Sequence, residues 1–215
     1  MAGLLEKDFR LLLQRKQALA LFLILGVVFG FSMEGSFILG YLPFLMTMLM
    51  VGTISYDEMD NGYQFLMTLP INAGIYVREK YLFCAGGTFV SWILAVILYL
   101  SAKVFRGESI DFLAEMPTTV SLLPVILILM SVMIPIQIKF GTEKSRVVMA
   151  MACGVFVACS FLLVKIVGEE WVENTFAFLD GMSESVFAAG AAALTAVVAA
   201  VSYRISYRVL KKKEF

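Results

Sequence analysis

Apolar residues fall into six blocks along the chain, at 18–33, 37–54, 81–102, 119–138, 147–167 and 186–203. Each block is close to the length that an α-helix needs to cross a bilayer, about 17–25 residues. Polar and charged residues gather between the blocks and at the two ends. The pattern therefore predicts an all-α membrane protein, with six transmembrane helices in a single domain that covers residues 1–215.

The connections between the blocks predict how the helices pair. Only the turn-forming Glu34, Gly35 and Ser36 separate the first two blocks, so we expect a helical hairpin over 18–54. The first block lacks a small-x-small cleavage site, and we therefore expect it to stay in the protein. Helices three and four cover 81–138, and Pro124 and Pro135 should kink the fourth. Helices five and six cover 147–203 and precede a basic tail, 204–215.

Composition agrees with a membrane protein and excludes several kinds of site. The chain is 60% hydrophobic and 16% charged, whereas soluble domains are about one-quarter charged. Its net charge is zero, so no basic field indicates nucleic acid. It contains no histidine, which excludes a histidine-based metal site or catalytic triad. Cys84, Cys153 and Cys159 lie in or beside apolar blocks and are interpreted as small buried residues.

Lysine and arginine are distributed unevenly over the two sides that six helices define. Fourteen of the seventeen lie before the first helix, in the loops 55–80 and 139–146, or in the tail. The other three are Lys103, Arg106 and Lys165. Because positive residues accumulate on the cytoplasmic side, both termini and the loop 55–80 are predicted to be cytoplasmic.

Two segments outside the blocks have amphipathic character. In residues 1–17, the apolar positions Leu4, Leu5, Phe9, Leu12 and Leu13 share a face, which predicts a helix lying along the inner leaflet. A frayed basic topology signal is the alternative. On the other side, acidic residues between 169 and 184 surround Trp171, so this loop is either a short helix at the outer surface or a solvated acidic loop.

The predicted membrane interior carries almost no ionisable chemistry. It contains no Asp, Glu, Arg or His, and Lys165 lies near enough to a helix end to snorkel. Ion-driven transporters and intramembrane enzymes rely on such residues, and the chain also lacks a phosphate-binding loop. No catalytic residue, metal ligand or cofactor is therefore predicted in this chain. Gly26 and Gly30 form a GxxxG pattern, which indicates close helix packing.

The cytoplasmic segment 55–80 is the longest polar interruption, with the sequence SYDEMDNGYQFLMTLPINAGIYVREK. We expect the second helix to carry its acids into water, a short apolar stripe to follow, Pro70 to end that turn, and Asn72 to cap a new helix. An energy-supplying partner docking here is one interpretation, and an ordinary connecting loop is the other. The candidate docking residues are Asp57, Glu58, Asp60, Asn61, Tyr63, Phe65, Leu66, Leu69 and Pro70.

Residues 57–72, DEMDNGYQFLMTLPIN, followed by Tyr76-Val77-Arg78-Glu79-Lys80-Tyr81, resemble the cytoplasmic loop of ABC-2-type transporter permeases. The opening Leu4-Leu5-Glu6-Lys7-Asp8-Phe9-Arg10 is similar to the start of that family. Where the family often has Ser-Arg after Leu-Pro-Ile, this chain has Asn72-Ala73. The short six-helix form most resembles the bacterial subgroup with a separate ATPase, some members of which export peptides of the phenol-soluble-modulin type.

The resemblance implies an ATP-binding-cassette export permease in a bacterial plasma membrane. It would pair with a second permease chain, as a homodimer or with a homologue, and would move an amphipathic or hydrophobic substrate outward. ATP and Mg²⁺ would bind to the partner ATPase, with 57–72 as the coupling helix, so the chain itself would not be an enzyme. The alternative function is a non-transporting membrane anchor or assembly factor that recruits a cytoplasmic partner.

Overall fold

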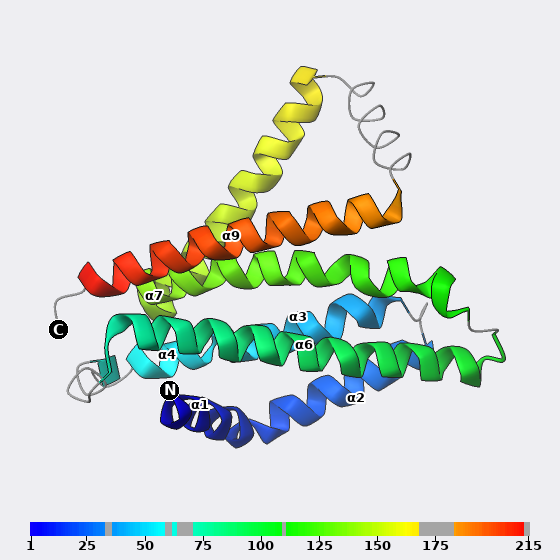
Figure 1. The fold of residues 1–215 in the computed structure, drawn as a ribbon, viewed down its shortest axis with the longest axis horizontal. Coiled ribbons are helices and arrows are strands. Elements are labelled where there is room, and N and C mark those ends of the chain that lie inside the picture. Colours follow the sequence, from blue (N-terminus) through cyan, green and yellow to red (C-terminus); the bar gives the residue numbers. More distant parts are fainter. Residues whose placement is uncertain (33–35, 59–61, 64–70, 109–110, 168–182, 213–215) are drawn as a thin grey trace.

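The computed structural model describes residues 1–32, 36–58, 62–63, 71–108, 111–167 and 183–212. This part of the chain is built from helices, as the sequence predicts (Figure 1). The helices are α1 (Ala2–Gln14), α2 (Lys16–Ser32), α3 (Phe37–Val51), α4 (Thr53–Glu58), α6 (Ala73–Phe105), α7 (Phe112–Val167) and α9 (Glu184–Lys212). Within these residues, four helical segments are long and apolar enough to cross a membrane, and a fifth is added if α1 and α2, bent by 68°, count as one span. The number of six stays a prediction.

Helices α2 and α3 pack against each other as the two arms of a hairpin. Phe29 on α2 contacts the rings of Phe37 and Tyr41 on α3, with centroid distances of 5.9 and 5.4 Å. Gly26 and Gly30 lie on the same interface, where an added Cβ at position 30 would come within 3.1 Å of Ile38 Cδ1. The small residues of α2 therefore let the two backbones approach closely.

Helix α3 lies at the centre of the bundle, in contact with α2, α6 and α7. Its buried face carries Ile38, Leu39 and Leu42. Deeper in the bundle, the hydroxyls of Thr47 on α3 and Thr88 on α6 are 2.7 Å apart. Neutral hydroxyls of this kind hold helices together without placing a charge in the membrane.

A second group of hydroxyls joins α6, α7 and α9. The Tyr81 hydroxyl lies 2.6 Å from Ser202 Oγ and 3.0 Å from Ser206 Oγ on α9. Ser202 in turn donates a hydrogen bond to the Ser131 carbonyl of α7. These bonds place α9 across α6 and α7, and they order one end of the bundle.

The helix that follows the polar segment 55–72 begins where the sequence predicts. Asn72 is the N-cap of α6, and its side-chain oxygen accepts a hydrogen bond of 2.9 Å from the Ile75 amide. An Asn cap satisfies one of the free amides of the first turn. From there α6 continues without a break to Phe105.

Helix α7 spans the fourth and fifth predicted helices and changes direction between them. Its non-helical dihedral angles belong to Gly141, with φ 71° and ψ −173°, whereas Pro124 and Pro135 lie inside helical segments. Figure 1 shows the part of α7 after this point rising away from the other helices. The predicted outer-surface helix around Trp171 lies outside the described residues.

We expect Gly141→Ala to destabilise the protein. The dihedral angles at this position are adopted almost only by glycine, and a Cβ would collide with the Glu58 carboxylate. The strain costs about 1–3 kcal/mol and should lower the unfolding temperature measured in detergent. The control is Gly86→Ala, because a Cβ there meets nothing within 4 Å. An equal change in both variants would contradict this role of Gly141.

Candidate functional site

Four helical ends meet at one end of the bundle. They are α1, α4, the beginning of α6 and the end of α9 (Figure 1). Helix α4 leads into segment 59–72 and α6 follows it, so this end holds both flanking helices of the segment that the sequence predicts as a docking element. Ion pairs join three of these helices, α1, α4 and α6. We call Lys7, Asp8, Asp57 and Lys80 the ion cluster.

Lys80 on α6 is the centre of the ion cluster. Its ammonium group pairs with the Asp8 carboxylate of α1, and it lies 2.7 Å from Asp57 Oδ2 of α4. The Lys80 and Asp8 side chains are 0% exposed, and that of Asp57 is 4% exposed. A single buried cation therefore joins three helices that are far apart in the sequence.

Neighbouring groups complete the coordination of these charges. Lys7 pairs with Asp57 and lies 3.2 Å from Asp8 Oδ1. The Tyr76 hydroxyl donates a 2.8 Å hydrogen bond to Asp57 Oδ2, and the Lys80 ammonium donates one of 3.3 Å to Thr53 Oγ1. Two lysines thus balance two aspartates. Tyr76 adds an uncharged donor to Asp57 and Thr53 adds one to Asp8 Oδ2, whereas Asp8 Oδ1 has no hydrogen-bond partner among the described residues.

The local sequence explains why these charges face inward. Asp8 lies one helical turn from Leu4 and one from Leu12, both of which pack into the core. Lys80 occupies the same kind of position between Tyr76 and Cys84, which are both buried. Residues four apart share a helix face, so burial of the apolar neighbours buries the charges as well. The buried face of α1 therefore needs the buried face of α6, because the ion that each carries is stable only when it is paired.

Glu79 lies beside the ion cluster but does not pair with it through a hydrogen bond. Its side chain is fully buried, and among the described residues neither carboxylate oxygen has a hydrogen-bond partner. A buried polar group without a partner is unfavourable, so any rearrangement that supplies a donor gains free energy. Lys80 is therefore fully paired with buried carboxylates, whereas the carboxylate of the neighbouring Glu79 has no hydrogen-bond partner among the described residues.

The structure changes the interpretation of several predicted docking residues. The expectation that Asp57 projects into water is wrong, because it is held in the ion cluster. Tyr63 is also buried, its ring lies 5.8 Å from that of Tyr76, and burial raises the pKa of its hydroxyl. Glu58 is partly buried and lies against Gly141. The other six, Asp60, Asn61, Phe65, Leu66, Leu69 and Pro70, lie outside the described residues.

The N-terminal helix also differs from its prediction in one respect. Leu4 does not face the leaflet but is buried in the core, and Leu12 packs against the same core. Phe9 and Leu13 remain 55% and 51% exposed. The apolar positions of α1 therefore serve two faces, one toward the bundle and one outward.

The sequence interpretation missed Lys7, Asp8 and Lys80 as functional residues, because they were treated as topology signals or as features of the family pattern. The available signal was an acid between Leu4 and Leu12, and a lysine between Tyr76 and Cys84, each at one-turn spacing. A charge inside an apolar stripe predicts a buried partner of opposite sign. Which partner it finds depends on how the helices pack.

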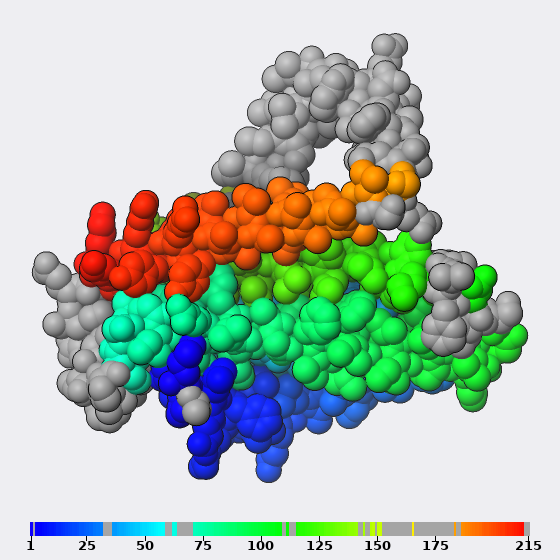
Figure 2. Space-filling view, in the orientation of Figure 1, coloured from blue at the N-terminus to red at the C-terminus, as the bar shows by residue number. Residues whose placement is uncertain are grey.

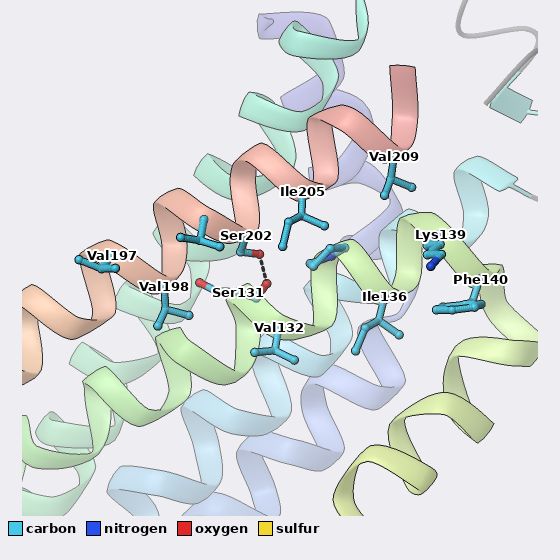
Figure 3. A pocket seen from close by; sticks show the side chains of 12 residues that line it. Ser131, Val132, Ile136, Lys139, Phe140, Val197, Val198, Ser202, Ile205 and Val209 are labelled. Atoms are coloured by element: carbon cyan, nitrogen blue, oxygen red, sulfur yellow. Dashed lines mark hydrogen bonds between the residues drawn. The ribbon is translucent and has the colours of Figure 1, made fainter. Parts of the chain in front are cut away.

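A groove of ≈ 480 Å³ lies between α7 and α9 (Figure 3). Figure 3 shows Val197, Val198 and Ile205 of α9 facing Val132 and Ile136 of α7, with Ser131 and Ser202 joined at its floor. The lining is mainly apolar, and Lys139 is the charged residue at one end. Such a surface can hold an apolar chain.

The described residues offer no metal site, since they contain no group of three or more Cys, Asp or Glu side chains with metal-binding geometry. The ion cluster cannot act as a ligand set either, because its carboxylates are already paired with lysines. What the arrangement can do is transmit force, since any movement of α4 or α6 at this end must move α1 or break buried ion pairs.

The model of one family, described as ABC-2 family transporter protein, matches residues 3–211. The chain belongs to this family. It is therefore a membrane component of an ABC transporter, and such components are not themselves catalytic. Members of the family generally pair with an ATP-binding subunit and dimerise. No curated protein and no solved structure matches the chain.

We expect Lys80→Met to cause a large loss of stability. The substitution keeps the length of the side chain but leaves two buried carboxylates with Lys7 alone, which costs about 3–5 kcal/mol. The unfolding temperature in detergent should fall strongly, and Asp8→Asn in the same chain should recover part of the loss.

The matched control is Lys103→Met on the same helix, where the cation pairs with Glu115 in a partly exposed position. Its effect on the unfolding temperature should be small. If Lys80→Met and Lys103→Met lower the temperature equally, the ion cluster is not the main connection at its end of the bundle.

Proposed function

We propose that the chain is the permease subunit of an ABC exporter, driven by a separate ATPase that docks on the cytoplasmic segment 55–80. The observation that carries this proposal is the ion cluster. It joins the helix before the docking segment, α4, to the helix after it, α6, and joins both to α1. A force applied to the segment between Glu58 and Asn72 would therefore act on three helices at once.

The distribution of charge supports an external energy source. Six predicted spans without Asp, Glu, Arg or His provide no intramembrane site for a driving proton. The Lys and Arg count supports a cytoplasmic position for the end of the bundle that holds the ion cluster. The docking segment lies at this end, where an ATPase would have access to it.

The proposed mechanism is a change in the packing of whole helices. ATP-driven closure of two ATPase subunits would move α4 and the start of α6 together, and the ion cluster would carry α1 with them. The ATPase can shift the equilibrium between two permease states only by binding them with different affinity. Glu79 favours such a shift, because a rearranged state that supplies a hydrogen-bond donor to its carboxylate gains free energy.

The groove between α7 and α9 supports an amphipathic or hydrophobic substrate. Its walls are valine and isoleucine side chains, and one cation stands at its end. A chain with an apolar face would bury that face in such a groove, and removing apolar surface from water is favourable. A second permease chain, a homologue or an identical copy, would complete the path across the membrane.

We expect the triple substitution Phe65→Ser, Leu66→Ser and Leu69→Ser to abolish recovery of the ATPase in a pull-down from nanodiscs. The sequence predicts that these side chains form one apolar stripe, and a cluster of large apolar side chains carries much of the binding energy of an interface. The matched control is Val104→Ser with Phe105→Ser, which alters exposed apolar residues at the opposite end of α6.

Undiminished ATPase recovery with the triple variant would overturn the docking assignment. Transport is tested separately, with ATP-dependent uptake of a labelled phenol-soluble-modulin-type peptide into inside-out proteoliposomes that contain both subunits. Retained docking without uptake of this or other amphipathic peptides would favour the alternative function, a membrane anchor that recruits a cytoplasmic partner.

A further inference from the structure

A second groove lies at the same end of the bundle, between the first turns of α6 and the last turns of α9. Its volume is ≈ 570 Å³, and its walls include Asn72, Ile75 and Arg78 of α6 and Tyr207 and Lys211 of α9. The Tyr207 ring lies against Gly74, where an added Cβ would be 3.5 Å from it. Figure 2 shows the red end of α9 over the blue-green start of α6 at this end of the molecule.

Among the described residues, the groove is lined by two cations and by no acid. Arg78 and Lys211 line it from opposite walls, and its other residues are neutral. Both cations are exposed, and neither takes part in the ion pairs found among the described residues, which involve Lys7, Lys80, Arg10 and Lys103. Arg78 and Lys211 share one cavity, and no ion pair among the described residues compensates their charge. This arrangement indicates an anion between them.

The surface that continues from the groove is apolar. On α6, Leu82, Phe89 and Ile93 follow Arg78 at helical spacing and are 57%, 49% and 44% exposed. These three side chains form an exposed apolar row that continues along α6 from the turn that carries Arg78.

We propose that this groove binds the phosphate of one anionic phospholipid, whose acyl chains lie along the exposed apolar row of α6. Basic pockets between transmembrane helices at the headgroup level are suited to such lipids. Arg78 can hold the phosphate with two parallel hydrogen bonds, Lys211 adds a point charge, and Tyr207 lies at the interface where aromatic rings are stable.

A soluble phosphate compound would use only half of this site. It would satisfy the two cations but leave the exposed leucine and phenylalanine surface without a ligand, whereas a phospholipid fits both parts. The lipid site rests on the proposed function only in the choice of leaflet. The lipid comes from the inner leaflet if the termini are cytoplasmic. The lipid would bridge the helix that leaves the docking segment and the C-terminal helix.

The test is a titration of the purified full chain in detergent with phosphatidylglycerol, phosphatidylcholine or glycerol 3-phosphate, with the unfolding temperature as readout. We expect phosphatidylglycerol to raise this temperature, and the other two to have little effect. In Arg78→Ala/Lys211→Ala, the apparent affinity for phosphatidylglycerol should be about thirtyfold weaker, which corresponds to about 1 kcal/mol for each cation. The charge-preserving Arg78→Lys/Lys211→Arg should retain most of it.

The matched control is Arg208→Ala/Lys212→Ala, which removes the same charge from the same helix end outside the groove. It should keep the wild-type response. Equal losses in both double variants, or an unchanged response in Arg78→Ala/Lys211→Ala, would overturn the proposal. A full response to glycerol 3-phosphate would overturn the lipid assignment. Recovery of the ATPase with the Arg78→Ala/Lys211→Ala chain distinguishes failure here from failure of the proposed function.

Discussion

The burial of Lys80 is the constraint on which this end of the structure depends. An ammonium group with no access to solvent must be surrounded by anions, and the two that it finds belong to α1 and α4. The apolar contacts of Leu4 and Leu12 also hold α1 against the core, and the ion pairs add a fixed register to that packing. The pairing of Lys80 therefore helps to set the position of the N-terminal helix and of α4 and α6 on both sides of segment 59–70.

Buried ion pairs often contribute little net stability compared with apolar packing, but they are specific. An apolar contact between α1 and α6 could slide by a turn, whereas the pairing of Lys80 with Asp8 and Asp57 holds at one position only. Specificity of this kind suits a unit that has to move as a whole. Further along α6, hydroxyl contacts such as that of Thr88 with Thr47 connect this helix to α3 through weaker bonds.

The division between charged and uncharged connections follows the membrane. In the predicted spans, the helices are joined by glycine contacts, aromatic rings and neutral hydroxyls, which cost little in a medium of low dielectric. The ion cluster lies at the end of the bundle, at the same level as the cationic groove of Arg78 and Lys211. Both faces of α6 at this end therefore carry charge, one turned toward α1 and α4 and the other toward α9.

The sequence predicted the helices and their caps more fully than it predicted the contacts between helices. The Asn72 cap, the helix through Lys80 and the helices on both sides of the first turn follow from local patterns, because capping and turn formation depend on a few adjacent residues. The prolines predict a kink within the fourth helix and the polar residues predict a loop at 139–146, yet the non-helical angles in α7 belong to Gly141, which lies against Glu58 of another helix. That choice depends on packing, which the local pattern does not contain.

By itself, the sequence determined that this chain is a helical membrane protein with a nearly uncharged interior and a polar segment at 55–80, because the length and composition of apolar blocks set these properties. The tertiary structure alone decided that Asp57 faces Lys80 and not water, and that Leu4 faces the core and not the leaflet. Both outcomes depend on the burial of Asp8 and Lys80. A charged residue reveals its partner only when the helices that carry both are placed side by side.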